Sequence, residues 1–155
     1  MTRTKRRMTL CTVLLLCNLV FIWGNSLLPA EVSGQISGTL KALLDGVFTP
    51  GEAVPSGGDG LLRKFAHFAE FGALGLLLGW LFGMLGKKRL PAFALGVAAA
   101  CIDEAIQSFV PGRSPGIRDV CIDSCGAAAG MLLLVLGHAY WKRRFTRKNS
   151  GGNET

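Results

Sequence analysis

The chain has 155 residues, of which 50% are apolar and 17% are charged, and it carries a formal net charge of +7. This length suits a single domain. So apolar a composition is unusual for a small soluble protein and indicates a membrane protein. Its basic residues are not interleaved with aromatic ones, so we expect no nucleic-acid partner.

Four apolar stretches each approach the roughly 20 residues that a membrane-spanning helix needs. They cover residues 8–28, 65–86, 90–110 and 120–141. We therefore predict an all-α membrane protein with four transmembrane helices in a compact bundle. This transmembrane domain, residues 8–141, lies between a basic N-terminus, 1–7, and a basic tail, 142–155.

The first stretch follows four basic residues, as the apolar part of a signal peptide also does. No small-x-small cleavage site follows at the right distance, and Leu16 before Cys17 is too large for a typical lipoprotein cleavage site. We expect an uncleaved first span. The five cysteines lack the spacing of a disulfide framework and are expected to act as small packing residues.

The longest loop joins the first and second spans. It contains apolar residues at helical spacing, followed by the flexible string TPGEAVPSGGDG. The spacing predicts an amphipathic helix that lies on the outer membrane surface and is formed around Ile36, Leu40, Leu43, Leu44 and Val47.

Lysine and arginine gather in three places: before the first span, in the turn between the second and third, and after the fourth. Four spans put all three places on one side of the membrane, and an excess of basic residues marks the cytoplasmic side. We therefore predict that both termini are cytoplasmic. The long loop and the string PGRSPG then lie outside the cell.

Polar residues recur where three spans approach this outer side. The second span begins with RKFAHFAEF, the third ends with IDEAIQ, and the fourth begins with RDVCID. Charged residues in a membrane usually face the bundle interior and pair with one another. We predict an outward-facing polar pocket formed by Arg63, Lys64, His67, Glu70, Asp103, Glu104, Gln107, Arg113, Asp119 and Asp123.

Two finer expectations concern how this pocket is held together. Arg113, in the loop between the third and fourth spans, is expected to bridge carboxylates and present its guanidinium outward; its expected partners are Asp103, Glu104 and Asp119. Glycine stripes are expected to let the second and fourth spans approach closely; they comprise Gly72, Gly75, Gly79 and Gly83, and Gly126 and Gly130.

Other interpretations of the polar cluster remain open. His67 and Glu70 have a spacing used by helical metal sites, but one histidine among carboxylates is a weak signature for zinc or iron. We therefore predict no metal and no cofactor. The charges could also serve only to fix the register of the helices, without any ligand.

Four strings of this sequence are characteristic in combination: GNSLLPAEVSG, RKFAHFAEFGALGLLL, DEAIQSFVPGRSPGIRDV and IDSCGAAAG. Together they resemble the VanZ-like family of small bacterial membrane proteins, named for a teicoplanin-resistance accessory protein. The resemblance extends over about residues 22–134. Two positions depart from the family's pattern: Asp123, where asparagine is frequent, and Phe71, where tyrosine is usual.

The resemblance implies a multi-pass protein of the bacterial plasma membrane, and in some members a reduced susceptibility to teicoplanin-type glycopeptides. It implies no particular reaction. Our leading hypothesis is a protein in contact with membrane lipids whose pocket binds a lipid-linked cell-wall precursor or a lipoglycopeptide. Mixed charge suits a phosphorylated or zwitterionic headgroup.

Two alternatives belong to other functional classes. One is a membrane enzyme in which His67 and a carboxylate perform acid–base chemistry on a lipid-linked headgroup. The sequence has no nucleophile motif, phosphatase signature or nucleotide-binding loop, so we assign no catalytic residue. The other is a non-catalytic assembly partner of cell-envelope proteins.

Overall fold

A computed structural model describes residues 2–35, 38–39 and 59–150, and this part of the chain is helical apart from its turns and loops. Each of its four long helices contains a segment long and apolar enough to cross a membrane, which agrees with the four predicted spans. These helices are α1 (Arg3–Ser26), α3 (Asp59–Met84), α4 (Arg89–Gln107) and α5 (Ile117–Ser150).

Between α1 and α3, residues 30–35 and 38–39 are helical. The apolar residues that predict an amphipathic helix in this loop lie outside the described residues, as does the flexible string after them up to residue 58; its last two residues, Asp59 and Gly60, begin α3. The orientation predicted for that helix on the membrane surface therefore stays a prediction.

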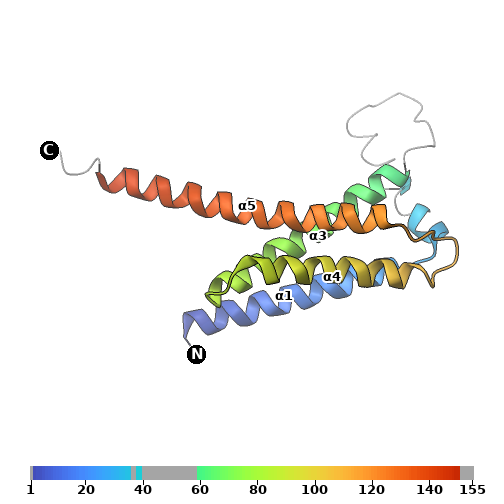
Figure 1. The fold of residues 1–155 in the computed structure, drawn as a ribbon, viewed down its shortest axis with the longest axis horizontal. Coiled ribbons are helices and arrows are strands. Elements are labelled where there is room, and N and C mark those ends of the chain that lie inside the picture. The colour runs from blue at the N-terminus through green and yellow to red at the C-terminus, as the bar shows by residue number, and fades with distance from the viewer. Residues whose placement is uncertain (1, 36–37, 40–58, 151–155) are drawn as a thin grey trace, which may run out of the picture.

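The helix α3 contacts each of the other three long helices, and its most extensive contact is with α5. Figure 1 shows α1 and α4 running alongside each other, with α5 extending well beyond the bundle at its C-terminal end. With 34 residues, α5 is about 50 Å long at about 1.5 Å per residue. The helix thus continues past residue 141, where the sequence placed the end of the span, because no proline or glycine interrupts the basic tail before Gly151.

The turn between α3 and α4 is short because glycine ends α3. Gly86 has a φ of +67°, a left-handed conformation that costs glycine little. Its N–H donates to the carbonyl of Gly83 at 3.2 Å, and the next N–H, that of Lys87, donates to the carbonyl of Phe82 at 2.9 Å. This pair of bonds is the Schellman motif, which satisfies two carbonyls at the helix end.

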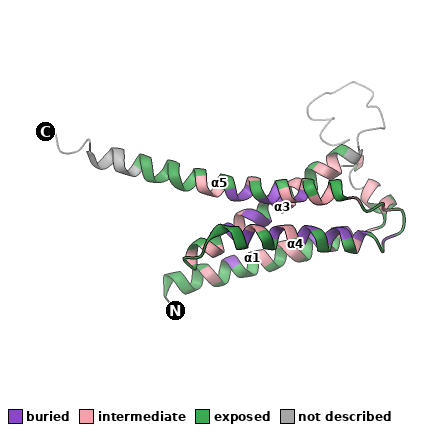
Figure 2. Cartoon of the chain, in the orientation of Figure 1, coloured by how far each residue is buried: buried purple, intermediate pink, exposed green. Residues whose placement is uncertain are grey.

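Buried apolar residues line the inner faces of the helices, and exposed apolar residues cover the outer faces. Ile22, Phe71 and Ala100 are fully buried, whereas Val20 and Leu90 are more than 70% exposed. Figure 2 shows burial concentrated on the inner faces and exposure along the C-terminal part of α5. Apolar side chains on the outside suit contact with lipid rather than water.

Glycines allow α3 and α5 to pack backbone against backbone. A Cβ atom at Gly75 would overlap the carbonyl of Ala127, and one at Gly130 would overlap the carbonyl of Gly72. The same holds for Gly126 of α5 against Phe68 of α3. The predicted close approach of these two spans is confirmed, since backbones this close leave no room for a side chain.

We expect Gly130→Ala to destabilise the protein by roughly 1–3 kcal/mol, because the added methyl group must push two backbones apart. Gly137→Ala on the same helix is the matched control, because a Cβ there meets no atom within 4 Å. That control should leave stability unchanged or raise it slightly, since alanine favours a helix over glycine by about 0.5–1 kcal/mol. Unfolding in detergent micelles followed by circular dichroism measures both, and equal stabilities would contradict the packing described.

Candidate functional site

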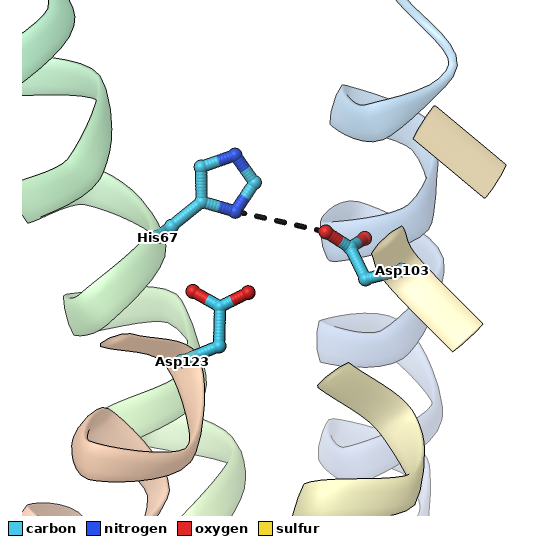
Figure 3. A group of neighbouring side chains, drawn as sticks. All are labelled: His67, Asp103 and Asp123. Atoms are coloured by element: carbon cyan, nitrogen blue, oxygen red, sulfur yellow. Dashed lines mark ion pairs between the residues drawn. The ribbon is translucent and has the colours of Figure 1, made fainter. Parts of the chain in front are cut away.

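The polar residues singled out from the sequence come together at one end of the bundle, where α1 and α4 end and α3 and α5 begin. At its centre lie His67 of α3, Asp103 of α4 and Asp123 of α5. Figure 3 shows the three side chains pointing toward a common space from separate helices. One potential ligand atom from each lies within 4.8 Å of the others, and the His67 Nδ1–Asp103 Oδ2 distance is 3.9 Å.

Burial distinguishes this trio from an ordinary surface cluster. Asp103 is 0% exposed and Asp123 is 3% exposed, while His67 is partly buried. Among the described residues, no lysine or arginine nitrogen lies within 4.0 Å of either carboxylate. Removing two carboxylates from water is costly unless something compensates their charge.

A hydrogen-bonded chain connects the trio to the end of α1. The Nε2 of Gln107 donates to Asp103 Oδ2 at 2.8 Å and to the hydroxyl of Ser26 at 3.3 Å. Next to it, Asn25 Nδ2 donates to Glu70 Oε1 at 3.1 Å. Glu70 therefore faces α1 rather than pairing with His67, although the sequence spacing had placed the two together.

Asn25 and Ser26 are site residues that the sequence analysis missed. Both lie in GNSLLP, at the end of an otherwise apolar helix, and Ser26 is fully buried. Two consecutive polar residues at the same end of the bundle as the charged cluster were the available signal. Their role depends on contacts with α3 and α4, which are 45 and 81 residues away in the sequence.

The loop between α4 and α5 is fixed by Glu104 and Arg113. A side-chain oxygen of Glu104 accepts a hydrogen bond from the backbone N–H of Gly116. Arg113 donates from Nε to the carbonyl of Leu28 at 3.2 Å and from Nη2 to that of Asn25 at 3.1 Å. Asn25 lies in the last turn of α1 and Leu28 lies two residues after its end, so Arg113 binds the backbone where α1 finishes.

The prediction that Arg113 bridges Asp103, Glu104 and Asp119 is therefore wrong, because its guanidinium binds main-chain carbonyls and no described carboxylate lies within 4.0 Å of it. Burial lowers the pKa of Arg113 from its ordinary value, and the charge of nearby Arg63 lowers it further. Arginine nevertheless stays protonated in proteins. Arg113 is a structural residue that fastens the α4–α5 loop onto α1.

A small polar pocket opens beside the trio and encloses about 270 Å³ of empty space, its open mouth included. Five of the ten predicted residues line it, and so does the apolar Ile122. The five are Arg63, His67, Gln107, Asp119 and Asp123. The other five predicted residues, Lys64, Glu70, Asp103, Glu104 and Arg113, do not line it. Asp103 lies behind the pocket in the trio, and Glu70, Glu104 and Arg113 hold the neighbouring helix end and loop.

Several buried polar atoms near the pocket have no hydrogen-bond partner among the described residues. They are His67 Nδ1, Glu70 Oε2, Asp103 Oδ1, Glu104 Oε2 and Arg113 Nη1. Buried polar atoms in folded proteins nearly always have a partner. The site therefore has unused capacity to bind a ligand, an ion or water.

The two departures from the resembled family's pattern have different consequences. Phe71 is fully buried in the apolar core with Leu74, an environment that suits a ring without a hydroxyl. Asp123 stands in the trio itself and places a second carboxylate beside Asp103. The departure at 123 therefore changes the chemistry of the site, whereas the one at 71 changes only the core.

We expect Arg113→Lys to lower the stability of the protein by about 1–3 kcal/mol, because a lysine has no planar fork with which to reach two carbonyls. Thermal unfolding in detergent measures the loss. Arg118→Lys is the matched control, since Arg118 is exposed and forms no contact with the end of α1. Equal melting temperatures for the two variants would contradict a fastening role.

Comparison with known proteins agrees with this architecture. The family model described as VanZ/LLP1 matches residues 8–138. This range covers most or all of each helix segment that could cross a membrane, and it includes every residue that lines the pocket. No curated protein and no solved structure gives a significant match. The chain belongs to the VanZ/LLP1 family and is a multi-pass membrane protein.

Proposed function

We propose that this protein binds the phosphorylated headgroup of a lipid-linked cell-wall precursor at the outer face of the bacterial plasma membrane. By binding that lipid it would change susceptibility to teicoplanin-type glycopeptides. The proposal rests chiefly on one observation: a polar pocket at the end of a membrane bundle is lined by an arginine whose guanidinium has no hydrogen-bond or ion-pair partner among the described residues.

Arg63 provides the charge that a phosphate needs. It lines the pocket, is half-buried, and forms no hydrogen bond or ion pair with a described residue. A guanidinium can hold a phosphate through two parallel hydrogen bonds. Asp119 and Asp123 on the opposite helix supply acceptors for hydroxyl or amine groups of a headgroup.

The rest of the bundle suits a ligand with a long apolar part. A second, apolar pocket, open to the surroundings, lies between α1, α3 and α4 and holds about 630 Å³ of empty space with its open side included; Leu19, Leu78 and Ile102 are among its lining residues. The polar pocket is too small for a whole lipid, so only the headgroup's phosphate portion would enter it. The apolar tail would stay among the helices and the surrounding lipid.

The proposal requires the pocket to face outward, with both termini cytoplasmic, as the basic residues indicate. Single cysteines at positions 56 and 150, in a chain without its five native cysteines, provide the test. A membrane-impermeant maleimide should label position 56 in intact cells and position 150 only after lysis. Labelling of position 150 in intact cells would place the pocket on the other side.

Lipid mass spectrometry on the purified protein tests the ligand. We expect a polyprenyl-phosphate lipid to copurify with the wild type and to fall at least fivefold in Arg63→Gln, which loses the charge. His67→Ala should also lose lipid. Arg118→Gln is the matched control, because it removes an equal charge from an exposed position outside the pocket.

The same variants, expressed in a teicoplanin-sensitive Gram-positive host, should lose any change in susceptibility that the wild type produces. Retention of only bulk phospholipid by every variant would contradict the proposal and leave the charges with a role in helix register alone. A precursor lipid whose headgroup changes mass during incubation would instead indicate an enzyme.

A further inference from the structure

We propose that His67, Asp103 and Asp123 bind one divalent metal ion of the class that accepts mixed nitrogen and carboxylate ligands, such as Zn²⁺ or Mn²⁺. The inference stands on the geometry of these three side chains and does not depend on the identity of any lipid. It revises the expectation from sequence, which judged one histidine among carboxylates too weak a signature and predicted no metal.

The distances between the three potential ligand atoms are slightly longer than those between the ligands of a bound metal ion. One potential ligand atom from each residue lies within 4.8 Å of the others, and His67 Nδ1 and Asp103 Oδ2 are 3.9 Å apart. Ligands of a tetrahedral zinc ion, with bonds of about 2.1 Å, are about 3.4 Å apart. If the ligand atoms each moved by roughly 1 Å through small changes in side-chain torsion, the site would close around an ion.

The buried atoms of the trio themselves point to a missing partner. Asp103 is 0% exposed, yet its Oδ1 has no hydrogen-bond partner among the described residues, and His67 Nδ1 has none either. Asp123, 3% exposed, accepts no hydrogen bond from a described residue. Figure 3 shows the three side chains pointing toward one space, with the Asp103 oxygen at the dashed line, Oδ2, facing His67. A single ion in that space would give each side chain a partner.

Charge supports the same conclusion. Two buried carboxylates repel each other, and neither has a lysine or arginine nitrogen within 4.0 Å among the described residues. His67 balances at most one of them, and only when it is protonated. A divalent cation neutralises both carboxylates while leaving the imidazole neutral, the form in which histidine binds metals.

The surroundings resemble the support that metal ligands usually have. Gln107 donates to the Asp103 carboxylate and is itself positioned by Ser26, which fixes the orientation of the carboxylate. Hydrogen bonds of this kind orient ligands in established metal sites. The polar pocket reaches His67 and Asp123, so an ion can enter and keep an open coordination position toward the pocket.

The donor set indicates the class of ion. An imidazole nitrogen disfavours Mg²⁺ and Ca²⁺, which prefer oxygen ligands alone. No cysteine belongs to the group, so ions that need thiolate are also disfavoured. A phosphate in the pocket could complete the coordination, which would explain how a headgroup is held between acidic side chains.

The test uses the full-length protein in detergent micelles, stripped with a chelator and dialysed against Zn²⁺, with bound metal measured by mass spectrometry. We expect about one zinc per wild-type chain, and at least a tenfold loss of affinity in His67→Ala, Asp103→Asn and Asp123→Asn. Asp119→Asn should keep its zinc within threefold, because Asp119 lines the pocket but lies outside the trio. The inference is overturned if the wild type binds no more zinc than an Asp103→Asn/Asp123→Asn double variant, or if Asp119→Asn loses as much.

A measurement on the wild type alone guards against variants that fail to fold. With Mn²⁺ as the probe, pulsed electron paramagnetic resonance should detect coupling to the nitrogen of His67; bound Mn²⁺ without such coupling overturns the site. Lipid phosphorus measured on the same samples separates the two proposals. Zinc bound in the absence of any phosphorylated lipid supports the metal site and counts only against the lipid.

Discussion

The structure depends on the backbone contact between α3 and α5. Gly126 lies so close to the carbonyl of Phe68 that no side chain fits between them. Phe68 follows His67 directly in α3, and Asp123 lies one helical turn before Gly126 in α5. The contact between Gly126 and Phe68 therefore also brings His67 and Asp123 together across the α3–α5 interface. Because membrane helices gain little from excluding lipid, such close packing is one of the few forces that holds them in a single register. Packing and polar chemistry are thus coupled here through adjacent residues.

The second constraint is the cost of charge within an apolar bundle, and the protein meets it in two ways. Some polar groups are used structurally: Arg113 completes the end of α1, Glu104 holds the backbone of the following loop, and Glu70 accepts a bond from Asn25. Others are left incomplete. Among the described residues, five of the seven buried side-chain polar atoms without a partner belong to the polar cluster at this end of the bundle; the other two are Asn18 Oδ1 and Trp23 Nε1. Polar residues retained within membrane spans at this cost usually mark a functional site.

The pocket combines a guanidinium that has no partner among the described residues with buried carboxylates beside it, so a ligand of the kind we propose has to tolerate both charges. A phosphorylated headgroup satisfies the arginine but is repelled by the carboxylates, unless a cation lies between. In the two proposals together, the phosphate of the lipid pairs with the arginine, and the metal ion compensates the carboxylates. For the metal ion no rearrangement of the helices is needed, because the three side chains already point toward a common space from three helices (Figure 3).

The sequence by itself determined the four spans, the glycine faces of α3 and α5, and the depth at which polar residues collect. These features follow from composition and helical periodicity, which are local properties. Helix ends were less predictable, and α5 continues to Ser150 because helix propensity does not stop where the apolar pattern does. Only the tertiary structure decided which polar residue faces which neighbour. It turned Glu70 and Arg113 toward α1, drew in Asn25 and Ser26, and joined His67 with Asp103 and Asp123, since rotation and crossing of helices depend on contacts between residues far apart in the chain.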